Sequence, residues 1–340
     1  MFKHALAAIA VSLFLASAAP AQETAASPDA KIGWLASSEE LASKVLSQNQ
    51  PPQSATQEAS TQPPPAKGPP LPFHTVEGVS GACIVPMAYM ANAGPPGTII
   101  GKPSAALTYL KANRKNVEAF TMTEVFYRRI EVGYALGRFG MGTLPGDIRR
   151  ATGVDIDTDE VWLHNFNARV MLIEESSWLP ALTAGVGFKY NQDVADINAK
   201  LFGGLNKIGY RRSNGTDYTL TATKMLPVIF GRPLIVTAGL RNSQAAQLGY
   251  LGFGDSCATT VEASVVYLPT DWLAVGYEFR QKSNPYDQIP GLVGEENNWH
   301  VVAVGLILKD WTICVGWAHL GTLANSSGNG AWAIQAKYEF

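Results

Sequence analysis

From about residue 73 to the C-terminus, apolar and polar side chains alternate with a period of two. In the stretch 273–280 (LAVGYEFR), for example, the odd-numbered residues are apolar or aromatic and the even-numbered ones are small or charged. Because successive side chains of a β-strand point to opposite faces, this pattern predicts strands with one apolar face. We identify twelve such segments, at 77–90, 105–111, 124–136, 162–174, 180–190, 217–226, 234–242, 261–268, 272–282, 298–308, 311–320 and 331–340.

Long and short connections alternate between these segments. A transmembrane β-barrel keeps its short turns at one end and its long loops at the other, whereas a soluble sandwich has no reason to do so. An even number of strands returns both ends of the barrel to one side, and closure leaves no unpaired strand edge. The pattern predicts an all-β fold, an antiparallel transmembrane β-barrel of about twelve strands over residues 73–340. In the long connection 191–216, residues 193–205 predict a short amphipathic helix at the barrel mouth or in the lumen.

Aromatic residues mark the expected ends of several strands. Such rings favour the two interfaces of a membrane. The predicted interface girdle consists of Trp162, Trp272, Trp299, Trp311, Trp332 and Phe340. A terminal Phe340 on an alternating strand is also typical of the C-terminal signal that the barrel-assembly machinery reads, so we expect this machinery as a partner, together with outer-membrane lipid.

The residues before the barrel predict export followed by a tether. Residues 1–21 combine an early Lys3 with an apolar run that ends in the triplet Ala19-Pro20-Ala21, which is typical of a secretory signal peptide. Residues 22–72 are rich in Pro, Ala, Ser and Gln and predict an extended linker. Within it, a capping box and an apolar stripe predict a short helix at 37–48. We therefore expect an outer-membrane location with this extension in the periplasm.

Composition excludes some classes of function and of site. Hydrophobic residues make up 46% of the 340 positions, charged residues make up 16%, and the formal net charge is −2, which excludes a polybasic nucleic-acid binder. The three cysteines, Cys83, Cys257 and Cys314, allow at most one disulfide. The acidic run at 155–160 (DIDTDE) resembles the start of a calcium loop but lacks the glycine and the glutamate that complete it. We expect no metal site and no cofactor.

Four stretches carry a resemblance to a known family: LPFHTVEGVSGACIVPMAYMA at 71–91, QLGYLGFGD at 247–255, VGYEFRQK at 275–282 and GWAHLG at 316–321. They resemble blocks of a bacterial family of unknown function whose members are exported proteins thought to be β-barrels. The resemblance covers about residues 71–340. It implies an envelope location and no particular activity.

By the same alternation, a set of charged side chains faces the interior of the barrel. These candidate lumen residues are Arg129, Glu131, Arg169, Lys189, Arg241, Glu262, Glu278, Arg280, Lys282, Lys337 and Glu339. Seven cations against four anions favour a water-filled pore with a mild anion preference, unless the charges pair across the lumen and close it. The predicted function is a porin-like passive channel for small polar or anionic solutes. The alternative is a non-conducting barrel that anchors or scaffolds envelope components.

Two further features leave alternatives open. The segment 301–308 is apolar on both faces, so it packs against the tether, against an inserted loop or against another protomer in a homo-oligomer. His319 lies near Asn325, Ser326 and Ser327 at the expected outer rim, which resembles the placement of catalytic residues in outer-membrane lipid hydrolases. Rim histidines are more commonly interfacial polar residues, so we predict no enzyme activity.

Overall fold

The computed structural model of the chain describes residues 72–229, 231–327 and 330–340. The predicted signal peptide, the predicted helix at 37–48 and all but the last residue of the predicted linker lie outside the described residues. The second of the two compact units into which the chain divides begins at Pro69 and contains every element described below.

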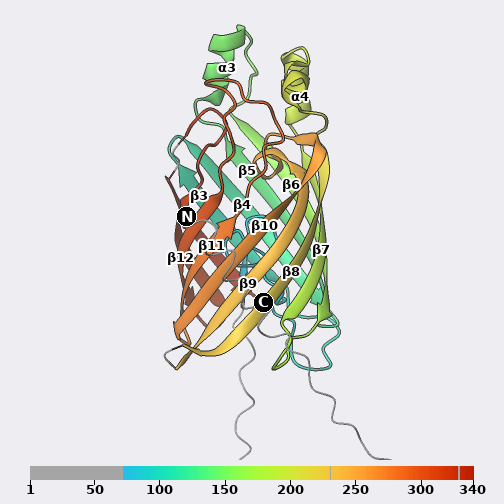
Figure 1. Cartoon of the computed structure of the whole chain (residues 1–340), viewed down its shortest axis with the longest axis vertical. Helices are drawn as coiled ribbons and strands as arrows, with labels where there is room; N and C mark the ends of the chain where they lie inside the picture. The colour runs from blue at the N-terminus through green and yellow to red at the C-terminus, as the bar shows by residue number, and fades with distance from the viewer. Residues whose placement is uncertain (1–71, 230, 328–329) are drawn as a thin grey trace, which may run out of the picture. The chain divides into compact units, whose positions relative to one another are not determined.

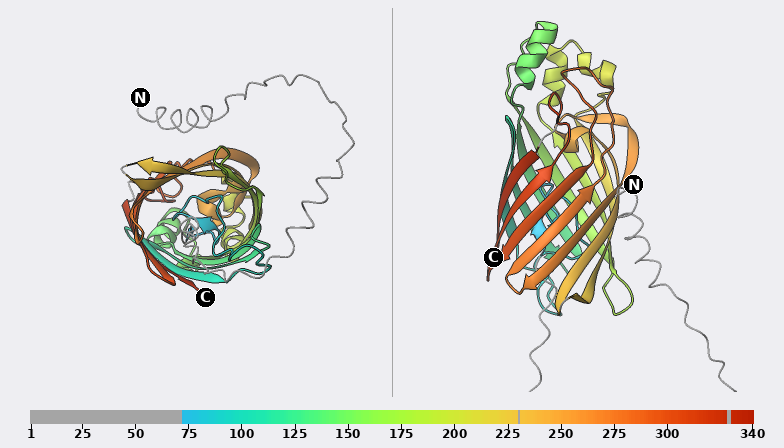
Figure 2. Two further views of the ribbon diagram at one scale, coloured as in Figure 1. Left: turned by 90° about the horizontal axis from the view of Figure 1, so that it is seen from below. Right: turned by 60° about the vertical axis from the view of Figure 1, so that its left-hand side comes forward.

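Twelve antiparallel strands form a closed barrel in which each strand pairs with its neighbours in sequence and the last strand pairs with the first (Figures 1 and 2). The strands are β3 (Ser104–Ala112), β4 (Lys115–Phe126), β5 (Ile130–Gly140), β6 (Glu160–Ile173), β7 (Ala181–Asn191), β8 (Asn214–Ile229), β9 (Arg232–Ala245), β10 (Phe253–Thr270), β11 (Leu273–Arg280), β12 (Trp299–Ile307), β13 (Trp311–His319) and β14 (Gly330–Glu339). The predicted fold and strand number are confirmed.

The predicted number of strands is correct, but two of the twelve predicted segments do not correspond to single strands of the wall. The predicted first strand at 77–90 is not in the wall, and the predicted single strand at 124–136 spans the end of β4, a turn and the start of β5. That turn is made by Tyr127 and Arg128 in the left-handed region, with φ of 51° and 59°. Neither residue is a usual turn former, because glycine, asparagine and aspartate adopt positive φ most readily. The sequence therefore held no signal for this turn.

The long connections gather at one end of the barrel, which we call the loop end, as the alternation predicted (Figure 1). Residues 141–159 carry helix α3 (Leu144–Thr152), and residues 192–213 carry α4 (Val194–Lys200) and the 3-10 helix η1 (Gly204–Ile208), close to the helix predicted at 193–205. The connection 246–252 contains the 3-10 helix η2 (Ala246–Gly249). The opposite end, which we call the turn end, has the tighter turns and both ends of the wall. None of the described helices is long and apolar enough to cross a bilayer.

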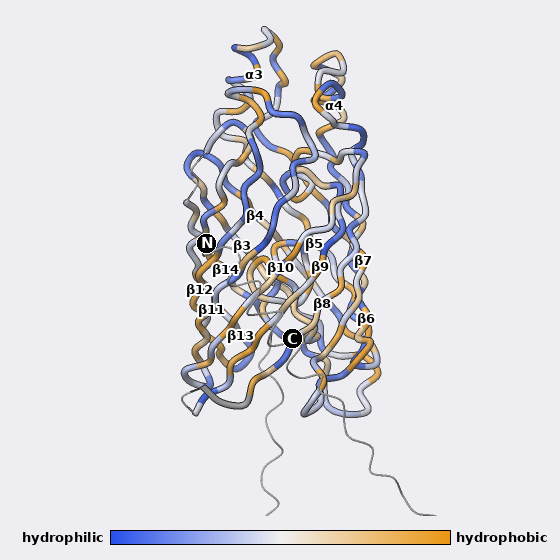
Figure 3. Tube along the Cα trace, in the orientation of Figure 1, coloured by the Kyte–Doolittle hydropathy of each residue, from blue (hydrophilic) through white to orange (hydrophobic). Residues whose placement is uncertain are grey.

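Large apolar side chains cover the outside of the wall. Val302, Val304 and Val315 are 50%, 44% and 46% exposed, and they alternate with inward-facing neighbours. Figure 3 shows that hydrophobic positions are concentrated along the strands toward the turn end. Since such a surface is unfavourable in water, the outer face is suited to a hydrocarbon environment.

Residues 72–91, which we call the plug, lie inside the barrel (Figure 2). The plug carries two short antiparallel strands, β1 (Phe73–His74) and β2 (Ser80–Gly81), and nearly all of its residues are buried. It enters at the turn end, reaches its tip around Ile84 and returns, and residues 92–103 then lead into β3. The predicted strand at 77–90 was wrong because its alternation serves a buried luminal hairpin rather than a wall strand.

The plug also explains the strand that is apolar on both faces. On β12, the outward face carries Val302 and Val304, whereas Gly305 faces the plug. A Cβ atom at Gly305 would lie 2.1 Å from the ring of Phe73 in the plug, so only glycine admits this ring. Of the alternatives that the sequence left open, β12 therefore packs against a segment inserted into the lumen.

Candidate functional site

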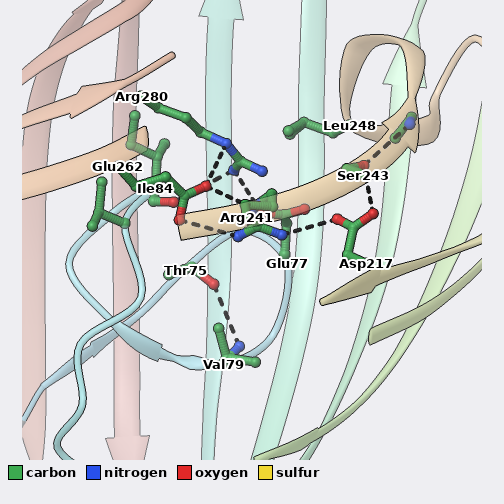
Figure 4. A network of polar contacts seen from close by, with 12 residues as sticks. Thr75, Glu77, Val79, Ile84, Asp217, Arg241, Ser243, Leu248, Glu262 and Arg280 are labelled. Atoms are coloured by element: carbon green, nitrogen blue, oxygen red, sulfur yellow. Dashed lines mark hydrogen bonds and ion pairs between the residues drawn. The ribbon is translucent and has the colours of Figure 1, made fainter. Parts of the chain in front are cut away.

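The centre of the lumen is a cluster of buried ion pairs around Glu77 of the plug (Figure 4). Its Oε1 lies 2.5 Å from Lys189 Nζ on β7, and its Oε2 lies 2.6 Å from Arg280 Nη1 on β11 and 3.3 Å from Arg241 Nη2 on β9. All four side chains are at most 6% exposed. A carboxylate buried this deeply is tolerated because cations from three strands surround it.

Two wall carboxylates complete the neutralisation of these cations. Asp217 Oδ2 lies 2.6 Å from Lys189 Nζ and 2.9 Å from Arg241 Nη1. Glu262 Oε1 lies 2.6 Å from Arg241 Nε and 3.0 Å from Arg280 Nε. Three cations thus meet three carboxylates once Glu77 is included. The surplus of positive charge that the sequence predicted for the lumen is therefore absent from this cluster.

The side chain of Glu278 on β11 binds the backbone of the plug. Its carboxylate accepts hydrogen bonds from the amides of Cys83, Ile84 and Val85, at 2.8, 2.8 and 2.7 Å. Buried amides need acceptors, and the plug tip has no neighbouring strand to supply carbonyls. This glutamate therefore does for the plug tip what a strand partner does in a sheet.

Glu131 on β5 and Arg169 on β6 hold together the two limbs of the plug, which are the parts before and after its tip at Ile84. Glu131 accepts hydrogen bonds from the amides of Ser80, at 3.0 Å, and Ala91, at 3.3 Å. Arg169 lies 2.8 Å from this carboxylate and donates to the carbonyl of Met87 at 2.7 Å. The pair gives the plug both an acceptor and a donor from the wall.

The turn-end limb of the plug is held by hydrogen bonds rather than by ion pairs. His74 lies 2.9 Å from Thr121 Oγ1 through Nδ1 and 2.8 Å from Ser104 Oγ through Nε2. The side chain of Gln335 on β14 accepts from the His74 amide at 3.3 Å and donates to its carbonyl at 2.8 Å. Lys337 donates to the carbonyl of Pro72. The entering chain is thus paired from its first described residue.

The predicted lumen residues therefore divide by position. Those that lie buried inside the barrel and contact the plug or its ion pairs are Glu131, Arg169, Lys189, Arg241, Glu262, Glu278, Arg280 and Lys337. Arg129 is a correction: it lies in the turn between β4 and β5, half-exposed, and pairs with Glu174 at 3.0 Å. Lys282 pairs with Glu296 at 2.9 Å near the loop end. Glu339 pairs with Lys337 at 2.6 Å near the turn end.

The predicted girdle residues also divide. Those that are about half or more exposed on the outside are Trp272, Trp311, Trp332 and Phe340. Trp162 is partly buried and its indole donates to Glu160 at 3.0 Å. Trp299 is a correction, because it is 6% exposed and turned into the barrel, under Lys282 at 4.6 Å from its ring centroid. Its register partner is the inward-facing Arg280, so it shares the inward parity.

Sequence reasoning missed Glu77 and Asp217 as members of the site. Asp217 is the first residue of the predicted strand 217–226 and shares the parity of Thr219 and Thr221, so the alternation within that strand already placed it on the inward face. Glu77 could not be found in this way, because it was assigned to a wall strand. Its cationic partners come from three strands that only the closed barrel brings together.

An apolar cavity lies in the lumen between the plug tip and the loop end. Cys83 and Ile84 of the plug line it on one side, and Leu248 and Tyr250 in and after η2 line it on the other. Further lining comes from Leu110, Val117, Val301, Ala318, Leu320 and Leu323. The lumen is therefore not the water-filled pore expected from the sequence. The plug and its buried ion pairs fill its centre, and an apolar cavity lies beside the plug tip.

The connection containing η2 bends into the lumen and closes this compartment. Gln247 and Leu248 adopt φ of 47° and 65°, a strained region for residues with a side chain. The bend is held because Lys189 donates to the Leu248 carbonyl at 3.2 Å, while Asn191 donates to the carbonyls of Gly249 and Tyr250, both at 2.9 Å. The same lysine therefore binds both the plug and this bend.

Two further candidates from the sequence were the acidic run at 155–160 and the polar residues near His319, and side chains of both groups pair with basic residues. Asp155 and Asp157 pair with Arg149 and Lys200, and the described residues include no group of three or more potential metal ligands. Near His319, the side chains of Asn325 and Ser326 accept hydrogen bonds from Lys115 Nζ at 2.7 and 2.8 Å.

Asn325 also ties the loop end to α3. Its amide donates to Asp147 in that helix, and this hydrogen bond, with the nearby charge of Arg150, lowers the pKa of Asp147. Residues 320–327 are thus fastened to the long connection 141–159.

The comparison that decides the family covers both the plug and the wall. A family described as "Protein of unknown function (DUF3034)" matches residues 72–337. The chain belongs to this family. The predicted resemblance to a family of unknown function is therefore confirmed, and the DUF3034 match begins at the first residue of the plug. No curated protein matches the sequence.

Solved structures similar to this DUF3034 member include several outer-membrane barrels. The KdgM porin is 11% identical with a TM-score of 0.44, covering 70% of this chain and 99% of that one. The COG4313 outer membrane channel from Pseudomonas putida F1 is 11% identical with a TM-score of 0.43, covering 73% and 100%. The outer membrane protein Omp33 of Acinetobacter baumannii is 8% identical with a TM-score of 0.40, covering 71% and 99%.

Proposed function

We propose that this protein is an outer-membrane channel for small solutes that its own plug holds closed. The observation that carries the proposal is that the plug is bound by side chains of the wall and is not a strand of it, so it can leave without opening the barrel. The apolar outer face and the absence of a free edge among the twelve strands support a membrane location. The predicted signal peptide supports export.

In this proposal, the channel passes polar solutes with little charge preference. When the plug leaves, Glu77 leaves with it, and Lys189, Arg241 and Arg280 keep Asp217 and Glu262 as partners. Cations and carboxylates then alternate around the lumen, with no ring of one sign that would select its opposite. This replaces the anion preference expected from the sequence.

Conductance in planar bilayers tests the proposal. We expect the full-length protein to be closed for most of the time and a variant lacking residues 72–91 to conduct at least about tenfold more, because the lumen loses its filling. Heat-modifiable mobility in electrophoresis checks that both barrels are folded. As a matched control, Glu118→Gln breaks only an exposed ion pair with Arg138 and should conduct like the unaltered chain.

The second candidate function is a non-conducting barrel that anchors or scaffolds envelope components. The observation that favours it is the number of wall strands that bind the plug through buried charges. Folded barrels without residues 72–91 that stay silent in the bilayer would contradict the channel and leave this scaffold. In either case we propose that the exposed terminal Phe340 serves recognition by the barrel-assembly machinery.

A further inference from the structure

Two cysteines face each other across the boundary between plug and wall. Cys83 lies at the plug tip and Cys314 lies in β13, and their Sγ atoms are 3.3 Å apart. They are separated by 231 positions in the sequence, so only the plugged fold brings them together. The third cysteine, Cys257, lies in β10 and is exposed.

Both backbones at this pair are fixed by other bonds. The Cys83 amide donates to Glu278 at 2.8 Å, and Cys314 is paired in register with Gly305 on β12 and Gln335 on β14. A disulfide requires the sulfurs to close from 3.3 Å to about 2.05 Å. The wall and the plug therefore already hold the two thiols near bonding distance.

We propose that Cys83 and Cys314 form a disulfide that locks the plug into the barrel. In the bond-forming step each thiol loses a proton, and the two electrons pass to the disulfide of a thiol oxidoreductase, which becomes a dithiol. Exported proteins meet such oxidants, whereas cytosolic ones seldom keep disulfides. The inference deepens the proposed function and rests on its envelope location, because the lock means that the channel opens only after reduction.

Alkylation followed by mass spectrometry tests the bond itself. The full-length protein is isolated from outer membranes in the presence of an alkylating reagent and digested without reductant. We expect a cross-linked peptide joining Cys83 to Cys314, with Cys257 alkylated. The cross-link should persist in Cys257→Ser and vanish in Cys83→Ser. Alkylation of Cys83 and Cys314 before any reduction, or a cross-link through Cys257, would overturn the proposal.

Conductance measurements distinguish a failure of the disulfide proposal from a failure of the channel proposal. A reductant should raise the open fraction of the full-length protein at least about tenfold, and Cys314→Ser should reach the same level without reductant. A reductant that leaves the open fraction unchanged, while barrels lacking 72–91 conduct, overturns the lock. A cross-linked peptide in barrels that stay silent even without residues 72–91 supports the disulfide and overturns only the channel.

A separate observation concerns the apolar cavity near the loop end. The volume of this cavity is about 70 Å³, whereas a single water molecule needs about 10–15 Å³. Two of its lining residues, Trp299 and Gln247, are each 6% exposed, and Trp299 Nε1 and Gln247 Oε1 have no hydrogen-bond partner among the described residues. A buried donor and a buried acceptor left unpaired are costly and rare.

The geometry points to a binding site for a small apolar molecule of about single-ring size that carries one hydroxyl group. The aliphatic lining takes the ring, and a hydroxyl can accept from Trp299 or donate to Gln247. The compartment lies between the loop end and the plug, and binding there does not depend on conduction.

Fluorine NMR with 4-fluorophenol and fluorobenzene tests this site on the full-length protein in nanodiscs. We expect saturable binding of both, with loss in Ala318→Phe, which fills the cavity, and no change in Val315→Phe on the outer face of the same strand. Val117→Phe fills the cavity from β4 and replaces Ala318→Phe if that barrel does not fold. Trp299→Phe should weaken only the phenol, about fivefold. No saturable binding, or equal loss in Val315→Phe, overturns the site.

Discussion

Replacing Glu77 by glutamine is expected to weaken the docking of the plug by about 3–5 kcal/mol. The substitution keeps the shape of the side chain but removes the charge that Lys189, Arg241 and Arg280 share. The three cations then keep only the carboxylates of Asp217 and Glu262, and all five side chains are at most 6% exposed. Leaving one buried cation without a counter-charge costs more free energy than losing the attraction between Glu77 and its partners.

Limited proteolysis under native conditions measures this effect, with a reductant present so that the proposed Cys83–Cys314 disulfide is open. The plug contains Phe73 and Tyr89 as cleavage sites for chymotrypsin, both buried in the closed barrel. Cleavage should accelerate by more than a hundredfold in Glu77→Gln if it follows the population of the undocked plug. Glu118→Gln, at a surface pair with Arg138, should shift it by less than about fivefold. Equal, slow cleavage of all three proteins would show that the ion pairs do not hold the plug.

Placing an arginine at Val304 is expected to destabilise the folded barrel in lipid by about 2–4 kcal/mol. Val304 lies near the middle of β12, is 44% exposed, and pairs in register with the outward-facing Val275 and Val315. If this face contacts acyl chains, a guanidinium there loses its hydration and has no partner on the wall. The cost on a soluble barrel would be near zero.

Urea unfolding in phospholipid vesicles measures this cost, and depth provides the control. Leu308→Arg, just past the end of β12 at the turn end, introduces the same charge near the expected interface, where it should cost about 0–1 kcal/mol. A Val304→Arg barrel as stable as the Leu308→Arg barrel would contradict the membrane orientation on which the proposed function depends.

The wall could be predicted from the sequence because its signal is local. Alternation within 273–280 depends only on which side of the sheet faces a greasy environment, and one strand shows it without reference to any other. The inward parity of Lys189, Arg241 and Glu262 follows for the same reason. The apolar outer faces and charged inner faces of these strands were therefore placed correctly.

The plug could not be predicted because its signal is not local. Its alternation imitates a wall strand, and its true role rests on acceptors from β5 and β11 that are remote in sequence. Trp299 was misplaced since its face is set by register with Arg280, which no single-strand pattern records. The stretches at 71–91 and 247–255 that carry the family resemblance turn out to be the plug and the bend that closes the cavity.

The seam of the barrel determines the order in which it can be assembled. The wall closes only when β14, at the very end of the chain, pairs with β3. The plug precedes β3 and is therefore synthesised before any strand of the wall. An insertion pathway that closes the seam last can fold the wall around a hairpin already inside it, so that encapsulation needs no later threading.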